Sequence, residues 1–94
     1  MFDSTESRAA LKMVRRFLLD HVPPSMIDRA AFDLIDQRQD AIDRRITALR
    51  AEAAAAMARA DPAPSPSMLF SFPYVLGMIV RERLKEIENN RGHA

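Results

Sequence analysis

Residues 25–60 read SMIDRAAFDLIDQRQDAIDRRITALRAEAAAAMARA, and no Gly or Pro interrupts them. This stretch predicts one long helix of about 54 Å at 1.5 Å per residue, about three times the mean helix length in globular proteins. Its second half carries apolar residues at alternating intervals of four and three, which is typical of the seam of a coiled coil or a long helical hairpin. The residues of this seam are Ile42, Ile46, Leu49, Ala53 and Ala56. We expect the seam to pack against another helix or across a dimer.

A polar run, Gln37 to Asp40, interrupts the apolar stripe between Ile35 and Ile42. A polar residue inside a seam can fix the register or the choice of partner at some cost in stability. The run can also be a solvent-exposed stretch where the helix leaves one neighbour and joins the next. We favour the second interpretation.

Two shorter helices are predicted on either side of the long one. Residues 4–21 have apolar side chains at helical intervals, among them Leu11, Val14 and Leu18, and Pro23 and Pro24 follow them. Residues 61–67, DPAPSPS, are predicted to be an extended spacer because proline recurs at alternate positions. A third helix is predicted over residues 71–90, with Pro73 in its first turn.

These elements predict an all-α fold with a single helical domain over residues 1–94. The arrangement would be a helical hairpin or three helices built on the long central helix. A chain of 94 residues has a small core, for which oligomerisation is a natural supplement. Residues 68–80, MLFSFPYVLGMIV, are apolar on every side of the third helix, and such a helix needs to be surrounded. We therefore expect a homodimer or a foreign partner.

The composition argues against catalysis and against a bound cofactor. The chain has no Cys and has His only at positions 21 and 93, so neither a nucleophile–base pair nor a His-based or thiolate metal site can be assembled. We expect no enzyme activity, no cofactor and no metal. Four acids share one side of the long helix, namely Asp33, Asp36, Asp40 and Asp43. They form a line and not a cage, and we expect them to face the basic stripe of the first helix, which consists of Arg8, Lys12, Arg15 and Arg16.

The charge pattern makes nucleic acid and membrane unfavoured partners. The net charge is +1, so bulk electrostatics supports neither class. Residues 62–80 carry no charge, but only 13 of them form an apolar run, and a bilayer span needs about 20. With no targeting signal at the N-terminus, we expect a cytoplasmic location. Twelve of the 14 basic residues are Arg and 15 residues are Ala, a usage that suggests a bacterial genome.

The function that remains is a non-catalytic module that binds another protein through an apolar helix face. We expect a small regulator, adaptor or inhibitor. Its partner-binding residues would be those left over when the third helix docks through one side only, namely Leu69, Phe70, Phe72, Tyr74 and Met78. The alternative is a small dimeric nucleic-acid-binding protein that uses Arg-rich helix faces.

The stretch VPPSMIDRAAFDLIDQR, residues 22–38, resembles the Pro-Pro start of the long helix in TraM-type antiactivators of quorum sensing. The resemblance covers less than a fifth of the chain, and the C-terminal helix does not match. It assigns no family. It implies antagonism of a transcription factor as one form that the regulatory role can take.

Overall fold

The computed structural model describes residues 4–92, and the side chains of residues 8–91. Within this range the chain forms four helices and no strand: α1 (Ser4–His21), α2 (Pro24–Asp33), α3 (Gln39–Ala58) and α4 (Pro66–Gly92). The predicted all-helical class is confirmed, and α1 has the bounds expected from the sequence.

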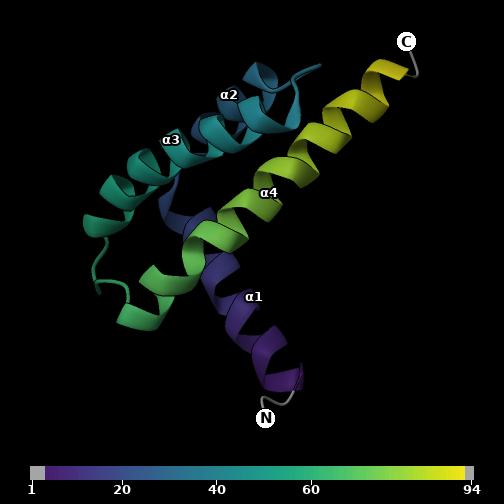
Figure 1. Cartoon of the computed structure of the whole chain (residues 1–94). Helices are drawn as coiled ribbons and strands as arrows, with labels where there is room; N and C mark the ends of the chain where they lie inside the picture. Colours follow the sequence, from purple (N-terminus) through teal and green to yellow (C-terminus); the bar gives the residue numbers. More distant parts are fainter. Residues whose placement is uncertain (1–3, 93–94) are drawn as a thin grey trace.

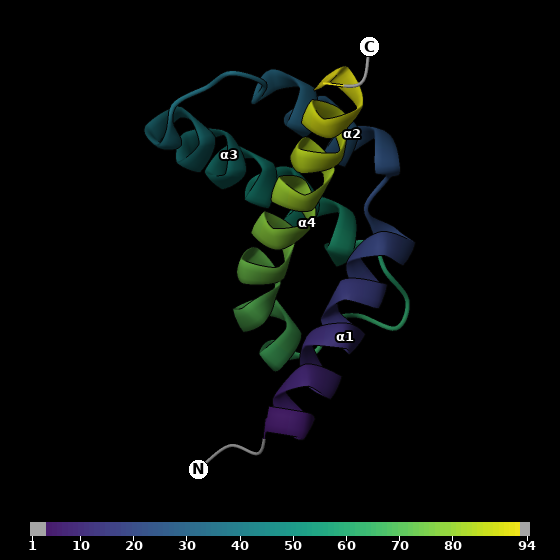
Figure 2. The same cartoon turned by 90° about the vertical axis from the view of Figure 1, so that its right-hand side faces the viewer.

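The last helix, α4, is the centre of the fold. It contacts α1, α2 and α3, and its contacts with α1 and α2 are the most extensive. Figures 1 and 2 show α1 beside the first half of α4, whereas α2 lies beside its second half. In Figure 1, α3 runs in the direction opposite to α4. The single long helix predicted for residues 25–60 is therefore not the central element.

The prediction of one long helix is wrong because the chain leaves helical geometry between α2 and α3. Leu34 caps α2, and its N–H donates to the Ala31 carbonyl at 3.1 Å. The Gln37 N–H donates back to the Leu34 carbonyl at 3.1 Å, and Asp36 has a φ of 61°. This left-handed conformation is one that Asp tolerates better than most residues. The polar run that interrupted the apolar stripe thus lies in a turn and at the start of α3.

The acidic residues of this region pair with α3 and α4, and the predicted pairing with α1 is wrong. Arg45 donates to Asp33 at 3.2 Å, Arg81 lies 3.4 Å from Asp43, and Arg91 lies 3.8 Å from Asp36. The basic stripe of α1 instead reaches α4, where Arg15 donates to Glu82 at 2.7 Å. Most of these side chains are exposed, so the ion pairs orient the helices more than they stabilise the fold.

An arginine on α4 holds α2. The Arg83 Nε donates to Asp28 at 2.8 Å, and its Nη1 donates to Glu86 at 3.1 Å. The hydrogen bond with Asp28, followed by the one with Glu86, raises the pKa of the Arg83 guanidinium above its usual value. Arg83 thus joins α4 to α2 through this ion pair.

The helix α4 starts earlier than predicted. It begins at Pro66, inside the segment that the sequence marked as a spacer. The Ser65 hydroxyl accepts a hydrogen bond from the Met68 N–H at 3.3 Å, which makes Ser65 the N-terminal cap. Pro66 at the first helical position has no N–H to leave unpaired. The extended connection is consequently shorter than residues 61–67.

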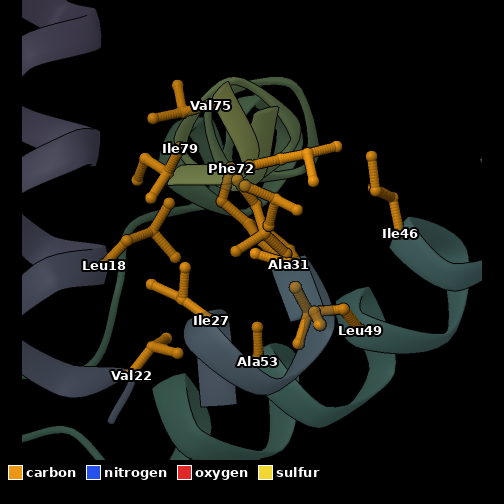
Figure 3. Close-up of a cluster of buried hydrophobic side chains, with 14 of the residues drawn as sticks. Leu18, Val22, Ile27, Ala31, Ile46, Leu49, Ala53, Phe72, Val75 and Ile79 are labelled. Atoms are coloured by element: carbon orange, nitrogen blue, oxygen red, sulfur yellow. The ribbon is translucent and has the colours of Figure 1, made fainter. Parts of the chain in front are cut away.

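All four helices contribute to one core (Figure 3). In it the apolar faces of α1, α2 and α3 pack against α4. The largest fully buried side chains are Leu18, Val22, Leu34, Leu49, Met57, Leu76 and Val80. No polar side chain among residues 8–91 is buried. The seam residues Ile46, Leu49 and Ala53 lie in this core, while Ile42 and Ala56 lie half-buried at its edge. In this structure the seam packs within one chain.

Candidate protein-binding groove between α3 and α4

One face of α4 exposes large apolar side chains. Phe70, Tyr74 and Met78 follow one another at intervals of four, which places them on the same side of the helix. Their exposed fractions are 90%, 65% and 38%. We call these three residues the α4 stripe. Leu69, which is 46% exposed, lies next to it.

Phe72 does not belong to this face, and its prediction as a partner-binding residue is wrong. Its side chain is only 6% exposed and lies in the core (Figure 3). Val75 and Ile79 follow Phe72 at helical intervals and are buried with it. The reason is that α4 docks through a wide face against three helices, so more of its apolar residues are used internally than a single docking side would need.

Two residues of the α4 stripe, Tyr74 and Met78, form one wall of a groove whose other wall is α3, while Phe70 lies one turn earlier on α4 and outside the groove lining. Asp43, Thr47 and Arg50 line the α3 side, and Tyr74, Met78 and Arg81 line the α4 side. Ile46, Pro73 and Gly77 complete the lining. We call this feature the α3–α4 groove; its volume is about 220 Å³.

Gly77 sets how the two walls meet. It is buried, and a Cβ placed on it would lie 3.9 Å from Ile46 Cγ2 and 3.1 Å from Arg81 Nη1. The missing side chain therefore lets the Arg81 guanidinium fold back over the helix backbone. In this position Arg81 also reaches Asp43 across the groove, at 3.4 Å.

The charges beside the stripe are mainly positive. Arg50 and Lys85 are exposed and have no ion-pair partner among residues 8–91. Lys85 lies one turn beyond Arg81 on α4. The single acid in the groove lining is Asp43, which already faces Arg81. The groove thus combines an apolar stripe with a cationic edge.

A second cleft lies where α1, α2 and α4 meet. Leu19, Val22, Ile27 and Ile79 provide its apolar lining, and its volume is about 180 Å³. Both arginines at its rim are already engaged, Arg15 with Glu82 at 2.7 Å and Arg83 with Asp28 at 2.8 Å. This cleft therefore presents fewer free polar groups than the α3–α4 groove.

Two further findings limit the chemistry of the described part of the chain. In that part, no three residues among His, Cys, Asp and Glu come together as a metal site. His93 lies outside it. Over the same residues, no helix is both long enough and apolar enough to cross a bilayer.

Sequence reasoning found the α4 stripe but missed the α3 wall. Arg50, Thr47 and Arg81 are ordinary polar residues along the chain, and only the packing of α3 against α4 brings them together. Gly77 was the one available signal, because glycine inside an apolar helical run often marks a close approach of backbones. Comparisons with protein-family models, with curated proteins and with solved structures find no match to this chain.

Proposed function

We propose that this chain is a non-catalytic module that binds another protein through the α4 stripe, and so acts as a small regulator, adaptor or inhibitor. The observation that carries the proposal is the 90% exposure of Phe70, the fifth residue of α4, while Phe72 two residues later is buried in the core. The core of one chain is filled without Phe70. Its aromatic ring is therefore available to a partner.

The chemistry of the stripe suits a protein partner. Aromatic and Met side chains are enriched at the centres of protein interfaces, because they bury large areas and, in the case of Met, adapt in shape. Contiguous apolar groups on a surface mark interaction sites more often than chance. A helix laid into a groove is a common way to bury such a stripe.

The homodimer, the cytoplasmic location and the bacterial origin expected from the sequence remain part of this proposal. A role as antagonist of a transcription factor, which the resemblance of residues 22–38 implies, is one form of it. Each awaits its own measurement.

The nucleic-acid alternative rests on α1, where Arg8, Lys12 and Arg16 are exposed and have no ion-pair partner among residues 8–91. Arg15 is already bound to Glu82. Binding to phosphates falls steeply with salt because counterions are released, whereas a complex with apolar anchors responds weakly. Titration of the isolated partner complex between low and high salt separates the two functions.

The proposed function is tested by capture of partners from the source organism with tagged wild-type chain and with the double variant Phe70→Ser, Tyr74→Ser. Mass spectrometry should identify a protein that the wild type retains and the double variant loses. Phe32→Ser is the matched control, since Phe32 is 56% exposed but lies on α2 and outside the groove lining.

Circular dichroism and urea melts must show that the double variant is folded. A folded double variant that retains every partner of the wild type contradicts the proposal. Loss of partners in the Phe32→Ser control as well would place the binding surface elsewhere.

A further inference from the structure

We infer that the α3–α4 groove binds an acidic amphipathic helix of the partner, with apolar side chains on the α4 stripe and carboxylates on Arg50 and Arg81. The inference rests on the proposed function and names the chemistry of its partner. Three observations lead to it.

The first observation is that donors in the groove remain free. Arg50 has no ion-pair partner within residues 8–91, and Arg81 makes one long contact of 3.4 Å with Asp43. A guanidinium has several N–H donors in a fixed fork that matches a carboxylate. Both arginines can therefore donate hydrogen bonds to a carboxylate of the partner without breaking a short internal bond.

The second observation is the contrast with the cleft between α1, α2 and α4. There Arg15 and Arg83 donate to internal carboxylates at 2.7 and 2.8 Å. An acidic partner would have to displace these bonds. In the α3–α4 groove, by contrast, the exposed Tyr74 and Met78 share a lining with Arg50 and Arg81, which make no short internal ion pair.

The third observation is the length of the stripe. Phe70 to Met78 covers nine residues of α4, which places the first and the last about 12 Å apart along the helix at 1.5 Å per residue. A partner helix with apolar anchors at positions i, i+3 or i+4, and i+7 spans about the same distance. Arg50 and Arg81 line the same groove as Tyr74 and Met78, so carboxylates flanking these anchors would lie near the two arginines.

The same charges disfavour a second copy of this chain in the groove. In a two-fold dimer the same patch meets itself. The face would then bring Arg50, Arg81 and Lys85 of both copies together, with Asp43 as the one acid of the groove lining. Like charges facing one another suppress such a contact.

The test is a display library of amphipathic helical peptides, with Leu, Ile or Phe at the anchor positions and Glu, Gln or Lys at the flanking positions, sorted with labelled full-length chain. Peptides retained by the wild type should be enriched in Glu. The double variant Arg50→Glu, Arg81→Glu should instead retain peptides enriched in Lys. Phe32→Ser should select the same peptides as the wild type.

Affinity measurements on the best Glu-containing peptide quantify the effect. Each single change, Arg50→Gln or Arg81→Gln, should weaken its Kd about two- to five-fold, the range of an exposed ion pair. Arg44→Gln on the outer side of α3 should leave the Kd unchanged, because Arg44 pairs with Asp40 and lies outside the groove lining.

Four results would overturn the inference. The first two are that the retained peptides show no preference for Glu, or that the Arg→Glu changes do not reverse this preference. The others are that a DNA duplex competes with the peptide at a comparable Kd, or that the Phe70→Ser variant loses the dimer mass. If the retained peptides bind the Phe70→Ser, Tyr74→Ser variant equally well, the proposed function itself fails. The two failures are therefore distinguishable.

Discussion

Gly77 on α4 lies opposite Ile46 on α3, where a Cβ added to the glycine would be 3.9 Å from Ile46 Cγ2. That distance is an ordinary van der Waals contact. The closer neighbour, Arg81 Nη1 at 3.1 Å, is the end of a flexible side chain and can move by a few tenths of an ångström. Gly77→Ala should therefore raise the free energy of unfolding by about 0.5 to 1 kcal/mol, since Ala is the better helix former. Urea denaturation measures this change.

The matched control is Gly77→Val. The extra methyl groups of Val would enter the space in front of Ile46, and crowding of a packed core destabilises. Gly77→Val should thus be less stable than Gly77→Ala. A Gly77→Ala variant that is less stable than the wild type would mean that α3 and α4 approach more closely than the structure indicates.

Ile46 tests the position of the seam. Its side chain is 4% exposed, so Ile46→Ala should lower the free energy of unfolding by about 2 to 5 kcal/mol, because burial is lost and a cavity remains. Ile42→Ala is the control, since Ile42 is half-buried and should cost less. A change of less than about 0.5 kcal/mol for Ile46→Ala, the level of an ordinary surface substitution, would show that the seam faces water.

Asp36 tests the turn that divides the predicted long helix. Its φ of 61° is disfavoured for residues with a Cβ by about 1 to 2 kcal/mol. Asp36→Gly removes that penalty and should raise stability, while Asp36→Ala should lower it by about 1 kcal/mol. Asp36→Asn should lie close to the wild type because Asn also tolerates this conformation. Thermal and urea melts of the three variants give the order.

The weak ion pair of Asp36 with Arg91, at 3.8 Å, needs its own control. Arg91→Gln removes the pair and leaves the backbone of the turn unchanged, so it should alter stability little. If Asp36→Gly is less stable than Asp36→Ala, residues 24–58 do not bend at Asp36 in solution.

The sequence predicted the bounds of α1 well because the prolines that follow it restrict the local backbone geometry. Pro23 and Pro24 disfavour helical geometry at the residue before each of them, and α1 ends at His21. The break at Asp36 was missed because residues 25–60 contain no Gly or Pro. The energy that favours the turn is tertiary: Leu34 is buried at 2% exposure, and the bend lets α2 and α3 both bury their apolar faces against α4. Helix propensity, which depends on local sequence, contains no information about this gain in burial.

For the candidate site, too, the sequence predicted the features that depend on local spacing and missed those that depend on tertiary packing. Phe70, Tyr74 and Met78 were identified because a stripe of period four is visible along the chain. Phe72 was assigned to the same surface because the number of helices packed against α4 was underestimated, and it is buried. Arg50 lies 24 positions before Tyr74, and only the packing of α3 on α4 brings the two into one groove.

Sedimentation equilibrium tests the dimer expected from the sequence. At micromolar concentration the mass should be about twice the monomer mass of 10.6 kDa, because a chain of this length has a small core that association supplements. The Phe70→Ser variant should keep the same mass, since the cations beside the α4 stripe oppose its contact with a second copy. A monomeric wild type contradicts the dimer alone. A wild-type dimer that becomes a folded monomer on Phe70→Ser assigns the α4 stripe to self-association, and the acidic partner helix would then have no free surface to occupy.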